Sequence, residues 1–238
     1  MSVVLRDIGV TLGGRMLLDG VSADLTDARV GIVGRNGSGK TTLARVIAGL
    51  IAPDRGTARI HGIDMARDRR AALRHVGIIF QNPDHQIIFP TVTEEIAFGL
   101  TQQGHTKGDA ERAAQTMLAR FGKAHWAQAA THSLSQGQKQ LLCLMAVLAM
   151  GPRVIVMDEP FSGLDIPTRL QLMRYLDRID AQLVMVTHDP AQLDGFDRIL
   201  WLDGGRLIGD GSPADLLPRF DQRMRAWGDA DDLAHLSG

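Results

Sequence analysis

A glycine-rich segment at residues 34–42, GRNGSGKTT, constrains the fold of this chain more than any other feature. It follows the apolar run ARVGIV (28–33), typical of a buried strand, and leads into KTTLARVIAGL (40–50), whose apolar residues recur at helical spacing. Glycines allow the backbone to point several N–H groups at one phosphate, and the helix N-terminus adds a partial positive charge. Strand, loop and helix in this order predict a loop that binds nucleotide phosphates.

The residue types within this loop match the pattern G-x-x-x-x-G-K-[ST]. We expect the Lys40 ammonium to reach the β- and γ-phosphates and the Thr41 hydroxyl to hold Mg²⁺. A glycine-rich turn with a chance lysine is the alternative, and the flanking strand and helix argue against it. The predicted phosphate-contacting residues are Asn36, Gly37, Ser38, Gly39, Lys40, Thr41 and Thr42.

Two acidic residues end another apolar strand, VIVMDEP at residues 154–160. The strand would deliver Asp158 to the sheet edge, where it can reach Mg²⁺ through water. Glu159, one residue on, is placed to accept a proton from an attacking water. Two acids at a strand end are, taken alone, a solvated turn, so this assignment depends on the phosphate-binding loop.

Composition narrows the class of protein. The 26 Lys and Arg against 27 Asp and Glu argue against an electrostatic nucleic-acid binder, which usually shows a basic excess. Cys143 is the single cysteine and lies in an apolar run, so no disulfide can form within the chain, and we expect it to be buried. The longest apolar run, 141–150, is about half of what a bilayer span needs, so if the protein works at a membrane, another subunit must supply the spanning helices.

The other patterns predict an α/β fold. Residues 3–12 and 17–25 alternate apolar and polar side chains like half-buried strands, whereas QLVMVTH (182–188) is typical of a buried parallel strand. A helical stretch interrupts the strands and opens with Thr91 and Glu94 in capping-box spacing. Further helices are expected over 137–150 and over 165–180, the second with Asp165 at its start, and the Gly-Gly pair at 204–205 predicts a hairpin turn. We therefore expect a mostly parallel sheet, an antiparallel β subdomain and an inserted helical subdomain. The expected units are one domain over 1–218, its helical subdomain at about 91–150, and a short tail at 219–238.

Six elements in this order resemble the nucleotide-binding subunit of ATP-binding-cassette (ABC) transporters. The resemblance runs from the first strand to about Pro218 and implies a P-loop NTPase fold that binds ATP with Mg²⁺ and hydrolyses it. The elements are GRNGSGKTT (34–42), Gln81, LSQGQ (134–138), VIVMDEP (154–160), SGLD (162–165) and His188.

The resemblance also implies residue roles. Gln81 would contact Mg²⁺ and the attacking water, Glu159 would be the general base, and His188 would reach the γ-phosphate. Asp165 would shape a dimer interface beside the LSQGQ signature. The signature residues that would close over a nucleotide held by a second subunit are Ser135, Gln136, Gly137 and Gln138.

A second subunit is also a physical expectation. One nucleotide cannot rest on two helix N-termini that lie far apart on one surface, whereas two chains related by a twofold axis satisfy both sites at once. A homodimer is therefore expected. Gln136 stands where the signature usually has glycine, so a longer side chain faces the phosphate than in most relatives.

The family usually stacks adenine on an aromatic side chain from an early β-turn. This chain has no Phe, Tyr or Trp before Phe80, and near TLGGRM (11–16) only Leu12 or Arg15 could lie against the base. We therefore predict weak base selectivity, with GTP hydrolysed at a rate comparable to ATP.

Residues 81–100, QNPDHQIIFPTVTEEIAFGL, are similar to the ATPases of energy-coupling-factor (ECF) importers, which take up vitamins and transition metals. This similarity implies a transmembrane coupling subunit, a substrate-binding membrane subunit, and a peripheral position on the cytoplasmic face of the cell membrane. An amphipathic loop or local core is the alternative for this stretch. The candidate contacts to the coupling subunit are Asp84, His85, Gln86, Ile87, Ile88 and Phe89.

The short chain favours a biotin importer, with cobalt or nickel uptake as the next choice. A chromosome or DNA-repair ATPase would need a long coiled coil between Gln81 and Ser135, and a ribosome-acting ATPase would carry two cassettes. A nucleotide kinase would have no use for LSQGQ. A soluble single-cassette ATPase of cofactor assembly remains the alternative function, and co-purification with membrane proteins would separate it from an importer.

Overall fold

The computed structural model describes residues 3–68, 71 and 74–230, and two sheets organise this part of the chain. The first is antiparallel, with strand order β2-β1-β4-β5. Buried and exposed side chains alternate over the second half of β2, as the sequence predicted, whereas register shifts after Leu5 break the alternation in β1. They are β1 (Val3–Leu12), β2 (Arg15–Leu25), β4 (Arg55–Ile60) and β5 (Ile63–Asp64).

The second sheet has six strands in the order β10-β9-β3-β8-β7-β6. All neighbours pair in parallel except β9 and β10, which form the predicted hairpin around Gly204 and Gly205. Both sheets together confirm the expected α/β class with a mostly parallel sheet and an antiparallel part. The strands are β3 (Arg29–Val33), β6 (Val76–Ile79), β7 (Val154–Asp158), β8 (Gln182–Val186), β9 (Arg198–Asp203) and β10 (Arg206–Gly211).

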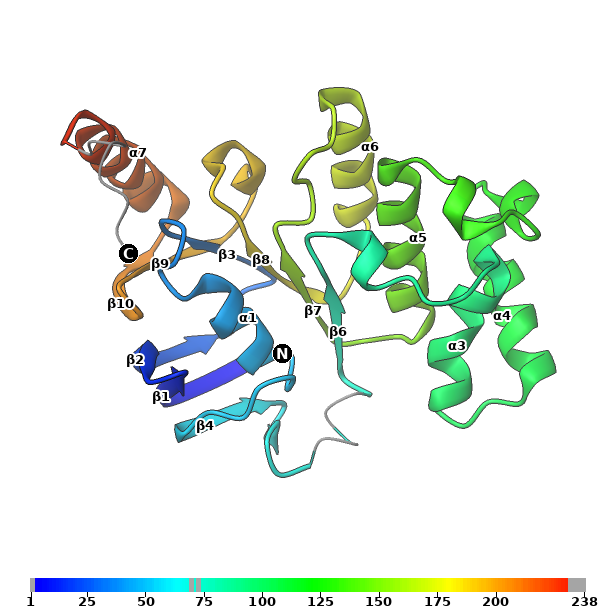
Figure 1. Cartoon of the computed structure of the whole chain (residues 1–238), viewed down its shortest axis with the longest axis horizontal. Helices are drawn as coiled ribbons and strands as arrows, with labels where there is room; N and C mark the ends of the chain where they lie inside the picture. Colours follow the sequence, from blue (N-terminus) through cyan, green and yellow to red (C-terminus); the bar gives the residue numbers. More distant parts are fainter. Residues whose placement is uncertain (1–2, 69–70, 72–73, 231–238) are drawn as a thin grey trace.

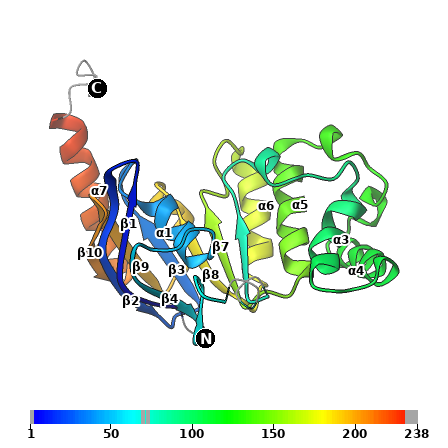
Figure 2. The same cartoon turned by 60° about the horizontal axis from the view of Figure 1, so that its bottom comes forward.

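The helices lie on both faces of the six-stranded sheet and extend beyond one edge of it (Figure 1). The antiparallel sheet and α7 stand at one end of the molecule and α3 and α4 at the other (Figure 2). The α-helices are α1 (Lys40–Ile47), α3 (Val92–Gln102), α4 (Lys107–Arg120), α5 (Gln136–Ala149), α6 (Ile166–Leu176) and α7 (Pro213–Ala230). Short 3₁₀ turns are η1 (Pro83–His85), η2 (Ala124–Trp126), η3 (Thr131–Ser133) and η4 (Pro190–Leu193).

Each face of the six-stranded sheet belongs to a different hydrophobic core. In β7, Val154 and Val156 face α1 and the antiparallel sheet, whereas Ile155 and Met157 face the helical side. Helix α1 therefore lies between the two sheets. The loop that precedes α1 follows the carboxyl end of β3. Cys143 is 1% exposed, which confirms its predicted burial, and burial raises the pKa of its thiol to about 12.

Side-chain caps begin the helices that the sequence predicted. Thr91 accepts a hydrogen bond from the backbone N–H of Glu94 at the start of α3, and Asp165 accepts one from Thr168 at the start of α6. At the start of α5, Ser135 and Gln138 form a capping box.

The C-terminal segment differs from expectation. Helix α7 runs through Pro218, so the boundary expected there falls inside a helix. Leu216 and Phe220 fix the helix, because both are nearly fully buried against β9 and β10. Residues 231–238 of the expected tail lie outside the described part of the chain. Among the helices that the structure describes, none combines the length and apolar character of a membrane span.

Candidate functional site

The loop between β3 and α1 has the geometry of a phosphate cradle. Lys40 is 5% exposed, and its Nζ donates hydrogen bonds to the carbonyl oxygens of Gly34 and Arg35, each at 2.8 Å. Gly39 has a φ of 102°, and a Cβ there would lie 2.6 Å from the Leu17 carbonyl oxygen. Only glycine fits this position, which brings the loop close to β2.

A buried hydroxyl and a buried ammonium group in this loop would both be stabilised by a bound anion. Ser38 Oγ is buried and has no hydrogen-bond partner within the described structure. Burial lowers the pKa of Lys40, although Glu159 and Asp158 oppose that shift. A phosphate oxygen would supply the hydroxyl with a partner and the ammonium with a counter-charge.

Asp158 lies at the carboxyl end of β7, facing α1. Its Oδ1 accepts a hydrogen bond from Thr41 Oγ1 at 3.1 Å, and burial raises the pKa of its carboxyl group. These oxygens are the hard ligands that Mg²⁺ prefers, and Mg²⁺ usually combines one or two protein ligands with substrate phosphates.

Glu159 stands at the centre of a second group of side chains. Its Oε2 accepts a hydrogen bond from Gln81 Nε2 at 3.4 Å and lies 3.0 Å from His188 Nδ1. Gln81 Nε2 also donates to Ser162 Oγ at 3.3 Å. The three residues that the sequence assigned to catalysis therefore meet, although they come from segments that follow β6, β7 and β8.

A cavity of ≈ 480 Å³ joins the cradle to this acid–amide–imidazole group. It is lined by six of the seven predicted phosphate-contacting residues of the loop and by all three predicted catalytic ones. Leu17 and Ser162 also line it. No local pattern marked Leu17, whereas Ser162 opens the SGLD segment. The predicted residues that line the cavity are Asn36, Gly37, Gly39, Lys40, Thr41, Thr42, Gln81, Glu159 and His188.

The predicted signature residues lie outside this cavity. Gln136 lines a separate cavity of ≈ 440 Å³, which shares Gln81 and Ser162 with the first. Gln136 Nε2 donates to the Ser162 carbonyl oxygen at 3.4 Å. Ser135 and Gln138 cap α5, and Asp165 caps α6. The structure thus brings the cradle and the catalytic group together in one cavity, whereas Gln136 of the signature lines an adjacent one.

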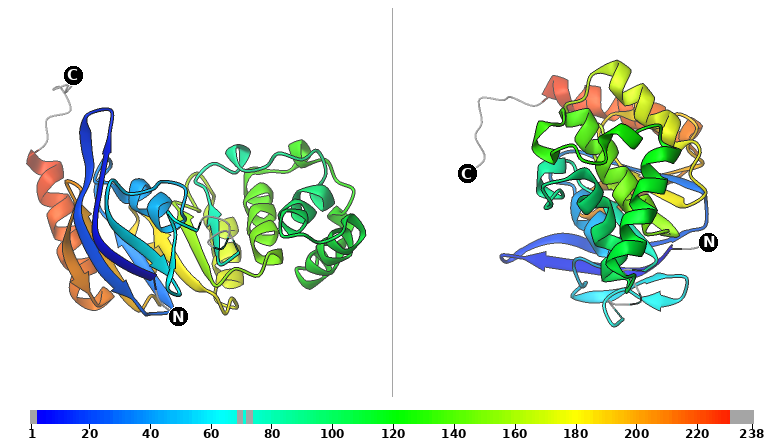
Figure 3. Two further views of the ribbon diagram at one scale, coloured as in Figure 1. Left: turned by 90° about the horizontal axis from the view of Figure 1, so that it is seen from below. Right: turned by 90° about the vertical axis from the view of Figure 1, so that its right-hand side faces the viewer.

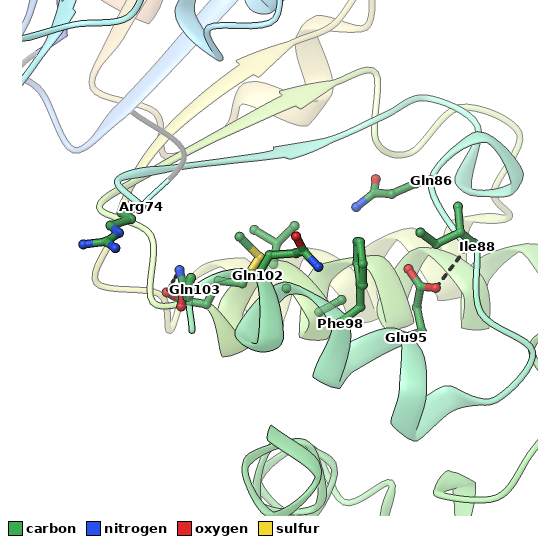
Figure 4. Close-up of a pocket in the computed structure, with 11 residues that line it drawn as sticks. Arg74, Gln86, Ile88, Glu95, Phe98, Gln102 and Gln103 are labelled. Atoms are coloured by element: carbon green, nitrogen blue, oxygen red, sulfur yellow. Dashed lines mark hydrogen bonds between the residues drawn. The ribbon is translucent and has the colours of Figure 1, made fainter. Parts of the chain in front are cut away.

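A third cavity, of ≈ 380 Å³, is a largely apolar groove between the segment after Gln81, α3 and α5. Figure 4 shows Glu95 and Phe98 of α3 pointing toward Gln86 and Ile88. Glu95 Oε2 accepts hydrogen bonds from the backbone N–H groups of Ile88 and Phe89, each at 2.9 Å. Of the six predicted coupling residues, Gln86 and Ile88 line the groove.

Comparison with known proteins decides the family. The model of the ABC transporter family matches residues 18–162. The chain belongs to the ATP-binding subunits of ABC transporters. It is therefore an ATPase, and the cavity at Lys40 is the candidate ATP site of this cassette.

Named relatives resemble this cassette over nearly its whole length. The biotin transport ATP-binding protein BioM of Rhodobacter capsulatus is 52% identical, covering 92% of this chain and 95% of that protein. BioM of Rhizobium etli is 38% identical, covering 92% and 98%. The energy-coupling factor transporter ATP-binding protein EcfA1 of Mycoplasma pneumoniae is 36% identical, covering 84% and 75%, which supports the ECF type.

A solved structure agrees with this family. CbiO1 from Clostridium perfringens, described as part of the ABC transporter complex cbiONQ, superposes with a TM-score of 0.77 at 27% identity, covering 94% of this chain and 98% of that one.

Proposed function

We propose that this ATPase powers the uptake of biotin as the ATP-binding subunit of an ECF-type importer. One observation carries the proposal. The chain shares 52% identity with a biotin transport ATP-binding protein across 92% of its own length and 95% of that protein's. The transported solute would be bound by a membrane subunit, so this chain supplies energy and does not select the vitamin.

The chemistry of the proposed site follows from its side chains. Lys40, whose Nζ lies beside the carbonyl oxygens of Gly34 and Arg35, neutralises the β- and γ-phosphates, and the loop amides cradle them. Thr41 and Asp158 fit a Mg²⁺ ion, and Gln81 lines the same cavity as Thr41. Such an ion, when bound, offsets the negative charge that develops on the phosphates.

Glu159 is the proposed general base. Its carboxylate accepts the proton of the attacking water, while Gln81 holds that water through its amide and keeps the carboxylate oriented. His188 borders both Glu159 and the cavity, so its imidazole can hydrogen-bond the γ-phosphate. The mutual contacts of the three side chains support this division of roles.

The proposed ATP site is completed by a second copy of the chain. Ser135, Gln136, Gly137, Gln138 and Asp165 do not line the cavity that contains Lys40. A head-to-tail homodimer would bring this signature over the partner's nucleotide. The γ-phosphate would then hold the two copies together, and hydrolysis would release them.

The groove in Figure 4 is the proposed docking site for a helix of the transmembrane coupling subunit. Ile88 is 64% exposed at its rim, and Phe98 and Val147 supply apolar walls. Glu95 holds the 88–89 segment, and Gln86 is hydrogen-bonded to the backbone at the end of β6. The short 3₁₀ turn η1 lies between Gln81 and this segment, so it connects the groove to Gln81. Of the other candidate contacts, Asp84 forms an ion pair with Lys139.

Purification from native membranes tests this function. A tagged copy of the chain is expected to co-purify with polytopic membrane proteins, and vesicles containing that complex should accumulate biotin only with internal ATP. The Glu159→Gln variant serves as the matched inactive control. Accumulation of cobalt or nickel but not biotin would identify a metal importer, and absence of any membrane partner would favour the soluble alternative.

A further inference from the structure

We propose that Trp227, near the end of α7, is a positioning residue for the phosphate-binding loop. It holds the side chain of Arg35 and so keeps the loop in the conformation that receives a nucleotide. The inference rests on the proposed nucleotide site. Trp227 lies outside residues 18–162, the range that the family model matches. The sequence patterns predicted no function for its segment.

The first half of α7 is fixed on the six-stranded sheet. Leu216 and Phe220 are 4% and 2% exposed, and the Phe220 ring meets the Trp201 ring of β9 edge-on at a centroid distance of 5.5 Å. Strand β9 pairs with β3, which leads directly into the phosphate-binding loop. Figure 3 shows α7 at the same end of the molecule as the β1–β2 hairpin. Helix α7 therefore begins against β9, and β9 pairs with β3, the strand that leads into the phosphate-binding loop.

The second half of α7 reaches the loop itself. The guanidinium carbon of Arg35 lies 4.7 Å from the centroid of the Trp227 ring. Arg223, four residues earlier on α7, lies 4.7 Å from the same ring. Both distances fall within the range of cation–π attraction. Arg223 restrains the ring from its own helix, and Arg35 joins the ring to the loop.

Arg35 also controls the part of the loop that Lys40 occupies. Its carbonyl oxygen accepts hydrogen bonds from Lys40 Nζ at 2.8 Å and from the Ser38 backbone N–H at 3.1 Å. The residue that α7 holds by its side chain therefore supplies the carbonyl that positions Lys40. If the loop is already ordered before the nucleotide binds, binding costs less conformational entropy. Loss of the ring should weaken nucleotide binding and leave the hydrolysis step intact.

Nucleotide affinity of the full chain tests this role. Kd for ADP with Mg²⁺ is measured by calorimetry, and KM and kcat for ATP by phosphate release. Trp227→Leu should raise Kd and KM about two- to fivefold with kcat unchanged, and Trp227→Phe, which keeps an aromatic face, should recover most of the loss. Arg225→Ala is the matched control, because Arg225 pairs with Asp221 on the same helix and should change neither constant.

A double-mutant cycle shows whether the two residues act together. If they do, the Kd of the Arg35→Ala/Trp227→Leu variant will not exceed that of the weaker-binding single variant. Should Trp227→Leu fail to fold, Arg35→Lys against Arg35→Ala carries the test, since lysine keeps the cation and should keep the affinity.

Two results would overturn the role of Trp227: an unchanged Kd in both single variants, or effects that multiply in the double variant. Lys40→Ala separates this failure from that of the site itself. If Lys40→Ala does not weaken ADP binding, the proposed nucleotide site is wrong; if it does, and Trp227→Leu does not, only the positioning role fails.

Discussion

At the residue scale, Glu159 combines backbone strain with a side-chain network. Its φ of 48° is a left-handed conformation that non-glycine residues rarely adopt, and its backbone N–H donates to the Val186 carbonyl oxygen at 2.9 Å. Such strain persists only where surrounding contacts maintain it, and it concentrates at functional sites. Here the conformation turns the carboxylate toward Gln81 and His188.

Replacing Glu159 by glutamine should therefore separate binding from turnover. Glutamine keeps the size of the side chain but cannot accept the proton of the water, so phosphate release should fall about a hundredfold or more. The calorimetric Kd for ATP should stay near the parent value. Hydrolysis at the parent rate would show that Glu159 is not the general base.

Base recognition also belongs to the residue scale. The turn between β1 and β2 presents Leu12 and Met16, which are 69% and 57% exposed, and carries no aromatic ring. GTP should therefore be hydrolysed at a rate comparable to ATP in a competition assay, and a strong preference for ATP would contradict this expectation. Leu12→Tyr should tighten binding of both nucleotides about two- to tenfold, because a ring can stack on either base.

Motif residues were the most predictable part of the site. Lys40, Thr41 and Glu159 were singled out from local motifs, and the three line one cavity in the structure. Leu17 was missed, since it reaches the cavity only through pairing of distant segments. The contact between Arg35 and Trp227 was missed for the same reason: 192 positions separate the two residues in the chain.

At the element scale, the start of α5 depends on close packing against α6. A Cβ at Gly137 would lie 2.3 Å from Thr168 Cγ2, so Gly137→Ala should destabilise the fold by about 1–3 kcal/mol through overpacking. Gly108→Ala in α4 is the matched control. Its Cβ would meet only Arg112 at 3.5 Å, so it should stabilise the fold by up to about 1 kcal/mol. Urea unfolding measures both, and equal effects would contradict this packing.

Helices and strands with regularly spaced apolar residues and a clear cap or turn were predictable, and α7 was not. The sequence predicted the helix that Asp165 begins, as well as the β9–β10 hairpin, because a cap or a Gly-Gly turn marks each boundary. Helix α7 contains Pro218 and many polar residues, so its local pattern indicates a helix only weakly. Tertiary burial of Leu216 and Phe220 overrides that local signal.

At the scale of the whole molecule, the chain carries two proposed half-sites, which line separate cavities within one copy. The cradle at Lys40 opens into one cavity, and Gln136 of the signature borders another. The overall class of fold followed from the alternation of strands and helices. The proposed composite site would need a second chain, and it stays a prediction.

Mixing two inactive variants tests this composite site most directly. Lys40→Ala removes the cradle cation, and Ser135→Arg blocks the signature, so each variant alone should hydrolyse almost no ATP. An equal mixture should regain about a quarter of parent turnover, because half of the random dimers then hold one intact site. A mixture with no turnover, from which cross-linking captures no head-to-tail pair, would contradict the shared site.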